Sequence, residues 1–158
     1  MTGAVEARLV AHGIELPNPA PPAANYVPYT IAESFVCVSG QITSLGGELQ
    51  YLGRLGENMD TADGYQAARL CGLNLIAQVK NACDGNLDRV KKVIRLGGFV
   101  NSTADFTEQP KVINGASDLM VDVFGEPAGQ HARFAVGVAS LPLGVAVEVD
   151  GTFQIDCA

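Results

Sequence analysis

The chain has 158 residues, and 47 % of them are hydrophobic, which is enough for a domain with a substantial core. The formal net charge of −7 argues against nucleic acid as a standing partner, because a phosphate backbone attracts clustered Lys and Arg side chains. No apolar run is as long as a membrane span and no signal peptide is visible, so we expect a cytoplasmic protein without a membrane partner.

The N-terminal part of the chain predicts a short helix followed by an extended segment. The apolar stripe over residues 3–12, with Gly13 after it, is typical of an amphipathic helix and its end. Four prolines over residues 16–22 favour an extended conformation. We therefore interpret residues 1–22 as an N-terminal extension of a single domain that comprises residues 1–158.

Two strands and a long helix are expected next. Strands are predicted over residues 26–31 and 34–42, and the second is nearly all apolar before Ser39, as in a strand buried on both faces. After glycine-rich turns, residues 61–82 carry apolar side chains at three- and four-residue steps, which predicts an amphipathic helix. A short strand is expected near residues 49–52 between those turns.

The second half of the chain alternates between strand and helix patterns. A β-branched strand is predicted over residues 90–100, and a second helix over residues 112–124, where Gly125 and Pro127 stop it. Two more strands follow. The order β-β-β-α-β-α-β-β predicts an α+β two-layer sandwich with both helices on one face of the sheet.

Four cysteines are present, and they show no metal-binding pattern. No C-x-x-C pair exists and no His lies at ligand spacing, so we expect no metal site. Three of the four fall at apolar-face positions and are predicted to be small core residues: Cys37, Cys71 and Cys83. No phosphate-binding loop or dinucleotide fingerprint is present, so no cofactor is expected.

The stretch from His131 to Ile155 is the most informative part of the sequence. From Val145 onward, apolar and polar residues alternate with period two, as in a strand with one packed face and one polar face. A Leu-Pro-Leu-Gly turn before it predicts a hairpin with the preceding strand. Arg133 and Glu148 then lie on rigid strands, where a catalytic guanidinium and carboxylate can be oriented well.

The predicted hairpin also raises a problem of distance. In a simple hairpin Glu148 faces Gly137 and Arg133 faces Thr152, which separates the two charged residues by roughly 13 Å along the strand. A bulge, long side chains or a neighbouring subunit must bring them together.

An ordered set of short motifs resembles the Rid proteins, the reactive intermediate deaminases that are also called YjgF or L-PSP-type proteins. The resemblance spans roughly residues 22–156. It implies a chorismate-mutase-like fold with a mixed sheet, assembled as a homotrimer with ligand clefts between subunits. The motifs are Pro28-Tyr29, Val38–Gln41, Asn101–Phe106, Ala132-Arg133, Leu141-Pro142 and Val147–Val149.

The resemblance also implies roles for individual residues. Arg133 matches the arginine that binds the substrate carboxylate, and Glu148 matches the glutamate that activates or positions the attacking water. Tyr29 matches the tyrosine that closes the pocket. Ser39 and Gly40 match the small residues whose backbone approaches the ligand.

The residues alone leave alternatives open. Arg133 in a purely structural role would pair with Asp150 or Glu148 at the end of the sheet, and Glu148 would be one polar residue on a half-exposed strand. His131 shares the Arg133 face by parity, and a residue at the rim of the site is the simplest interpretation of it.

Some positions depart from the family pattern. Phe134 follows the arginine where a small or polar residue is usual, although alternation points it away from Arg133. Ala135 stands where the family often has Cys. The asparagine of the second helix corresponds to Asn114 or, counting back from the end of the helix, to Ser117.

The resemblance implies a cofactor-free deaminase that hydrolyses 2-imino acids to ammonia and a 2-keto acid. A non-catalytic protein that binds a small carboxylate on the same scaffold is the alternative, because a fold alone does not confer function. An endoribonuclease, an activity attached to this family by name, is disfavoured by the acidic composition.

Overall fold

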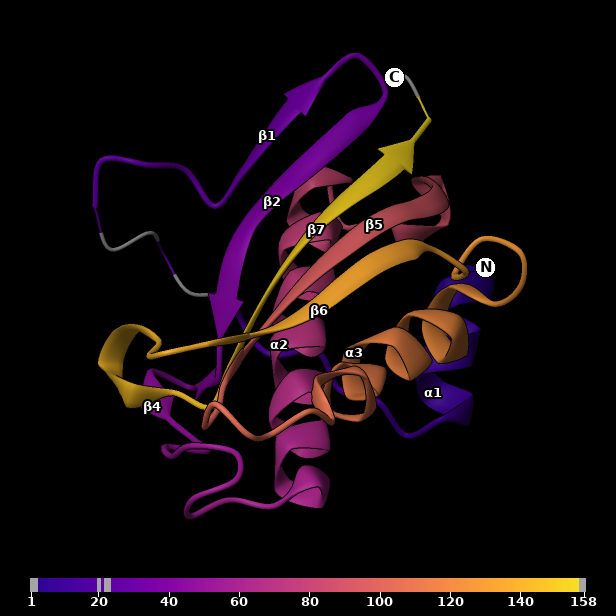
Figure 1. Cartoon of the computed structure of the whole chain (residues 1–158). Coiled ribbons are helices and arrows are strands. Elements are labelled where there is room, and N and C mark those ends of the chain that lie inside the picture. The colour runs from indigo at the N-terminus through magenta and orange to yellow at the C-terminus, as the bar shows by residue number, and fades with distance from the viewer. Residues whose placement is uncertain (1–2, 20, 22–23, 157–158) are drawn as a thin grey trace.

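The computed structural model describes residues 3–19, 21 and 24–156, and its largest element is a five-stranded sheet (Figure 1). The strand order across this sheet is β1-β2-β7-β5-β6. Strands β5 and β6 run parallel, and the other neighbouring strands are antiparallel. Strands β3 and β4 pair only with each other. The strand bounds are β1 (Tyr29–Ala32), β2 (Phe35–Ile42), β3 (Ser44–Leu45), β4 (Glu48–Leu49), β5 (Val90–Asn101), β6 (Ala132–Val138) and β7 (Val147–Ile155).

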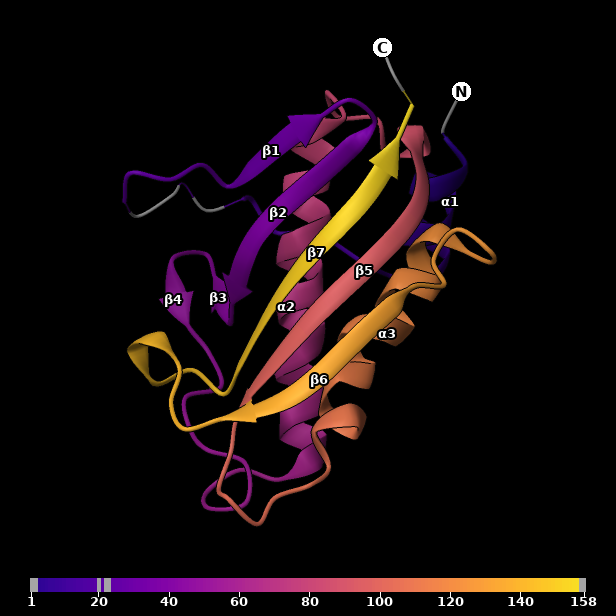
Figure 2. The same cartoon turned by 45° about the horizontal axis from the view of Figure 1, so that its top comes forward.

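Two long helices cover one face of the five-stranded sheet, as Figure 2 shows. Helix α2 (Thr61–Ala82) packs against β2 and β7, whereas α3 (Gln109–Phe124) packs against β5 and β6. The core lies between the two layers, where Phe153 and Leu75 are fully buried. The predicted α+β fold is therefore confirmed. No helix in the described part of the chain is both long and apolar enough to span a membrane.

Local sequence signals predicted most element boundaries well. Helix α2 begins and ends where the apolar stripe does, and the Asp60 carboxylate caps it by accepting a hydrogen bond of 2.8 Å from the Asp63 backbone N–H. Helix α3 begins at Gln109 rather than residue 112, because Pro110 fits the first turn of a helix. Along β7 buried and half-buried residues alternate over the whole strand, as the period-two pattern predicted.

The predicted hairpin between the last two strands is wrong. Strand β5 lies between β6 and β7, and Leu96 of β5 faces both Arg133 and Gly151. Helix α3 returns the chain to the outer edge of β5, so that β5, α3 and β6 form a parallel crossover unit. The Leu-Pro-Leu-Gly turn, which contains the short 3-10 helix η2 (Pro142–Gly144), then carries the chain across the end of β5 to β7.

The prediction that β2 is buried on both faces is also wrong for the isolated chain. Val36 and Val38 are buried against the helices, but Phe35 and Cys37 are exposed, so Cys37 is not a core residue. Nothing in the described chain covers the side of the sheet opposite α2 and α3, which we call the open face. We define the open face by the side chains of Phe35, Cys37, Phe99, Phe134, Val136, Glu148 and Asp150.

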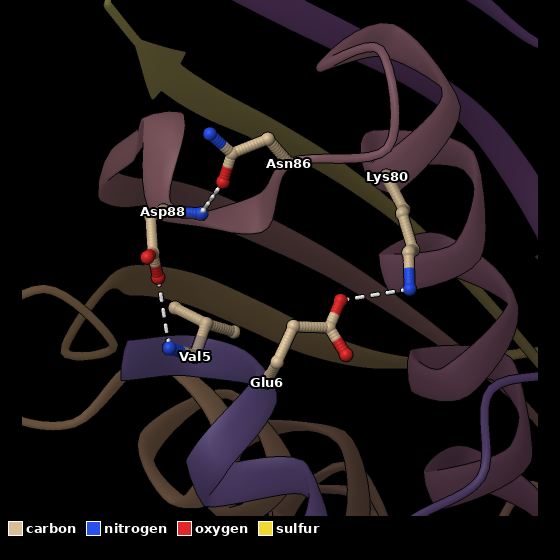
Figure 3. Close-up of polar contacts among 5 residues, drawn as sticks. All are labelled: Val5, Glu6, Lys80, Asn86 and Asp88. Carbon is tan, nitrogen blue, oxygen red and sulfur yellow. Dashed lines mark hydrogen bonds and ion pairs between the residues drawn. The ribbon is translucent and has the colours of Figure 1, made fainter. Parts of the chain in front are cut away.

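Helix α1 (Ala4–Ala11) packs against α3 and is held at its N-terminus by a residue far along the chain (Figure 3). The Asp88 carboxylate accepts hydrogen bonds from the backbone N–H groups of Ala4 and Val5, at 3.0 and 2.8 Å. Glu6 forms an ion pair of 2.8 Å with Lys80 of α2. Asp88 therefore acts as the helix cap that Gly3, with no side-chain donor or acceptor, cannot provide.

Candidate functional site

Arg133 lies on the helix-facing side of β6, the edge strand of the sheet. Its guanidinium donates hydrogen bonds of 3.1 Å to the Ser117 hydroxyl and 3.1 Å to the Pro110 carbonyl oxygen. None of the ion pairs between described residues includes Arg133. The structural alternative, in which Arg133 pairs with Asp150 or Glu148, is therefore wrong. The guanidinium is held in place by neutral groups and keeps its charge available for a ligand.

A pocket of about 280 Å³ opens beside this guanidinium, between β6 and α3. Asn114 and Ser117, the two candidates for the family's asparagine, both line it, because residues three apart on a helix lie on one face. Of the two, Ser117 is the one that contacts Arg133. Asp118 also lines the pocket, and its carboxylate accepts a hydrogen bond of 2.8 Å from Tyr65.

His131 belongs to the same pocket and is more than the rim residue that its sequence position predicted. Its Nδ1 lies 2.7 Å from the Gly129 carbonyl oxygen, and its Nε2 lies 2.9 Å from the Ser117 hydroxyl. In the neutral ring the proton therefore belongs on Nδ1, where it is donated to the carbonyl, and Nε2 accepts from Ser117. This leaves a lone pair of the Ser117 oxygen for Arg133. The three side chains form one continuous chain of hydrogen bonds.

The surroundings of His131 favour the neutral ring that this chain requires. Burial lowers the pKa of His131 below its usual value, and the positive charges of Arg133 and Lys92 act in the same direction. The hydrogen bond to the Gly129 carbonyl oxygen raises the pKa of His131 and offsets these effects only in part.

Glu148 lies on the open face, away from the Arg133 pocket. It is half-buried beside Gly40, where a Cβ would clash with the Glu148 carboxylate, so a larger residue at this position would displace the carboxylate. Gly40 and Ser39 form a bulge, in which two residues of β2 stand opposite one residue of β7. Burial raises the pKa of Glu148, and the negative charge of Asp150 raises it further.

The remaining two candidates, Ser39 and Tyr29, make other local contacts in the single chain. The Ser39 hydroxyl donates a hydrogen bond of 2.8 Å to the Val27 carbonyl oxygen, which fastens the segment before β1 to β2. Tyr29 lines a separate pocket of about 340 Å³, together with Asn81 and Arg89. Within one chain the sequence-predicted site residues thus fall into three places rather than one.

The positions of Arg133 and Glu148 follow from the strand register. Arg133 is level with the buried residues Leu96 and Gly151, whose side of the sheet faces the helices. Glu148 is level with Phe99 and, beyond it, with Val136. Because neighbours along a strand alternate between faces, the two charged side chains point to opposite sides of the sheet. A site that uses both requires a second chain.

Comparisons with known proteins agree with this fold. The family profile described as "YjgF/chorismate mutase-like, putative endoribonuclease" matches residues 6–150. The chain belongs to this YjgF family. Protein TCP17 of Trypanosoma cruzi is 48 % identical, and the match covers 98 % of this chain and 96 % of that one.

Solved structures of the family superpose closely. A Shewanella oneidensis protein described as a "putative endoribonuclease" is 42 % identical, with a TM-score of 0.92 over 97 % of this chain and 100 % of that one. Escherichia coli TdcF with bound serine is more distant, at 24 % identity and a TM-score of 0.59 over 89 % and 94 % of the two chains. This second likeness shows the shared fold alone.

Proposed function

We propose that the protein is a 2-imino acid deaminase that works without a cofactor, as a cytoplasmic homotrimer. The observation that carries this proposal is the Arg133 guanidinium, which two neutral partners hold at the side of a pocket. It forms no ion pair with a described carboxylate, and Asp118, which also lines the pocket, is hydrogen-bonded to Tyr65. A guanidinium in this state binds a carboxylate through two parallel hydrogen bonds. The serine in TdcF, which carries such a carboxylate, is consistent with this class of ligand.

The water that attacks the imine needs a base, and Glu148 of a neighbouring subunit is the group that we assign to it. Water adds its oxygen to the imine carbon and gives a proton to the carboxylate. The carboxylate passes this proton to the imine nitrogen, which gives a carbinolamine. The carbon–nitrogen bond then breaks as the carbinolamine hydroxyl loses its proton and the nitrogen takes one up, which leaves ammonia and a 2-keto acid. Burial raises the pKa of Glu148 and so makes its carboxylate a stronger base than an exposed one.

Two features of the single chain support an assembly of subunits, and the number three is what the family resemblance implies. The open face exposes large apolar side chains on separate strands, with Phe35 of β2 40 % and Val136 of β6 42 % exposed, which supports its role as an interface. In addition, Arg133 and Glu148 face opposite sides of the sheet, so a complete site needs two subunits. We propose that the ligand cleft lies between them.

Phe134, one of the departures from the family pattern, does not reach the Arg133 pocket. Phe134 stacks its ring edge against Phe99, with centroids 5.3 Å apart, and Arg95 lies 4.7 Å above the Phe134 ring. These contacts lie on the open face, away from Arg133. This supports the view that Phe134 changes packing between strands rather than ligand binding.

Hydrolysis of 2-iminopropionate, generated in situ, tests the proposal. We expect the protein to accelerate release of the keto acid, and Arg133→Ala to lower kcat/KM about 100-fold, the order expected for losing a pair of charge-assisted hydrogen bonds. Arg69→Ala removes the same charge at another pocket and serves as the matched control. Acceleration that survives in Arg133→Ala would refute the assignment.

The same assay separates the two rival functions. Binding of pyruvate that requires Arg133, without any acceleration of imine hydrolysis, would identify a non-catalytic carboxylate-binding protein. RNA cleavage that is lost in Arg133→Ala or Glu148→Ala would instead support the endoribonuclease named in the family description. RNA cleavage that survives both substitutions would come from a contaminating nuclease or from another site on the protein.

A further inference from the structure

A second pocket, of about 350 Å³, lies at the carboxyl ends of the parallel strands β5 and β6. In sheets with parallel strands this end is where ligands usually bind. The pocket has one charged side chain in its lining, that of Arg54, and no carboxylate. Its other polar lining groups are supplied by Ser102, Thr103 and Gln109. In a chain with a net charge of −7, the lining of this cavity carries one positive charge.

The backbone around Arg54 is fastened to the end of β5. The Leu55 N–H donates a hydrogen bond of 2.9 Å to the Asn101 carbonyl oxygen, and the Thr103 N–H donates one of 3.0 Å to the Leu55 carbonyl oxygen. The Arg54 N–H itself donates to the Asn58 side chain at 2.7 Å. These bonds fix the position from which the Arg54 side chain reaches the pocket, although it comes from a loop.

The Arg54 guanidinium has no hydrogen bond or ion pair with any residue that the structure describes, and its Nε atom is buried. A buried donor without an acceptor is costly, and a charged one more so. By contrast, Arg133 is satisfied by two acceptors and Arg89 pairs with Asp84 at 2.9 Å. The missing acceptor of Arg54 indicates a ligand group that supplies negative charge and oxygen lone pairs.

The opposite wall of the pocket offers further donors. A Cβ at Gly137 would lie 2.6 Å from the Ser102 hydroxyl and 2.8 Å from the Gln109 Nε2, so glycine keeps this corner open. Gln109 donates one of its two amide N–H bonds to the Phe106 carbonyl oxygen at 2.7 Å, which leaves the other for the pocket. Ser102 adds a hydroxyl. Donors thus surround the cavity from the Arg54 loop, from β5 and from α3.

We propose that this pocket is a second ligand site, which binds the oxyanion of a small molecule, a carboxylate or a phosphate, with Arg54 as its anchor. It does not depend on the deaminase activity. Gly137 and Arg133 are four residues apart on the same face of β6, roughly 13 Å along the strand. The hydrogen bond from Arg133 to the Pro110 carbonyl oxygen lies between the two pockets.

Titration calorimetry with inorganic phosphate and, separately, with malonate tests this site and distinguishes the two kinds of oxyanion. We expect at least one of them to bind the wild-type protein, and Arg54→Gln to weaken that binding at least tenfold. Arg133→Ala removes the carboxylate site of the deaminase pocket, and the binding that remains in this variant should show the same dependence on Arg54. The charge-matched control Arg69→Gln should change the binding less than twofold. Gly137→Ala, which keeps the charge but fills the corner of the pocket, should also weaken it.

The results that would contradict a second ligand site can be told apart. Absence of binding by both anions to the wild-type protein overturns the proposal. Binding that is lost in Arg133→Ala but kept in Arg54→Gln assigns the anion to the deaminase pocket instead, and equal weakening by Arg69→Gln reveals only general electrostatic attraction. Thermal unfolding of each variant shows that it is folded. Because imine hydrolysis is measured separately, failure of this proposal leaves the deaminase proposal standing, and the reverse also holds.

Discussion

Arg133 and Glu148 leave the same five-stranded sheet on opposite faces, with strand β5 between their strands. Arg133 points toward α3 and Glu148 lies over Gly40 on the open face. A single chain therefore cannot bring the two groups to one small substrate. In the cyclic trimer that we propose, each site would instead take the guanidinium of one subunit and the carboxylate of the next.

Mixed trimers of two inactive variants test this division of the site. Arg133→Ala and Glu148→Ala subunits, co-expressed in equal amounts, should recover activity, because about one site in four then combines an intact Arg133 with an intact Glu148. We expect about a quarter of the wild-type rate of imine hydrolysis, against almost none for either variant alone. As control, each single variant is co-expressed with the double variant, which supplies neither group. Mixed trimers that remain inactive would show that the two residues do not share an intersubunit site.

The hydrogen-bond chain from His131 through Ser117 to Arg133 predicts a pH dependence of stability. Burial lowers the pKa of His131 in the folded protein, so the unfolded chain binds a proton more readily than the folded one. The free energy of unfolding should therefore fall as the pH drops from 7 through the unfolded value near 6.5. One such proton contributes a slope of at most about 1.4 kcal/mol per pH unit.

Urea unfolding at pH 5, 6 and 7 measures this slope. His131→Asn should flatten it, whereas His12→Asn, which changes the exposed histidine after α1, should leave it as in the wild type. The same slope in His131→Asn and in the wild type would show that other groups cause the acid sensitivity.

The sequence predicted the elements well because the signals for them are local. The apolar stripe and the Asp60 cap define α2 within its own residues, and alternation defines β7. Strand pairing is not local. The pattern around the Leu-Pro-Leu-Gly turn is compatible with a hairpin, and only the crossover through α3 places β5 between β6 and β7.

The candidate site, too, could be predicted from the sequence only where local motifs specify it. Motif spacing singled out Arg133 and both of its helical neighbours, Asn114 and Ser117, and these do line one pocket. Arg54 carried no signal, because its pocket is built from residues about 50 to 85 positions further along the chain. The apolar pattern of β2 predicted burial on both faces, and the isolated chain buries one. A covered open face in the trimer would reconcile the pattern with the structure.

Cysteine labelling tests whether the open face is covered in solution. Cys37 lies on that face and is exposed in the single chain, whereas Cys71 and Cys83 are buried and their burial raises the pKa of both thiols. If the open face packs in the trimer, iodoacetamide should modify Cys37 at least about tenfold more slowly in the native assembly than in unfolded protein.

Mass spectrometry of the individual peptides follows each cysteine separately, and Cys37→Ser identifies the Cys37 signal. Cys71 should stay unmodified in both native and dissociated but folded protein. Rapid modification of Cys37 in a protein that sediments as a trimer would place the subunit interface elsewhere.

The attachment of α1 by Asp88 gives a prediction about stability rather than activity. Asp88→Ala leaves the N–H groups of Ala4 and Val5 without their acceptor and should lower the free energy of unfolding by about 1–2 kcal/mol, as loss of a helix cap does. Asp84→Asn is the control, because that carboxylate is 90 % exposed, its pair with Arg89 is a surface one, and Asn tolerates the positive φ of 53° at this position. Urea unfolding gives the two free energies, and amide hydrogen exchange in α1 shows whether this helix opens first. An effect of Asp88→Ala no larger than that of Asp84→Asn, with unchanged exchange in α1, would show that packing against α3 alone holds the helix.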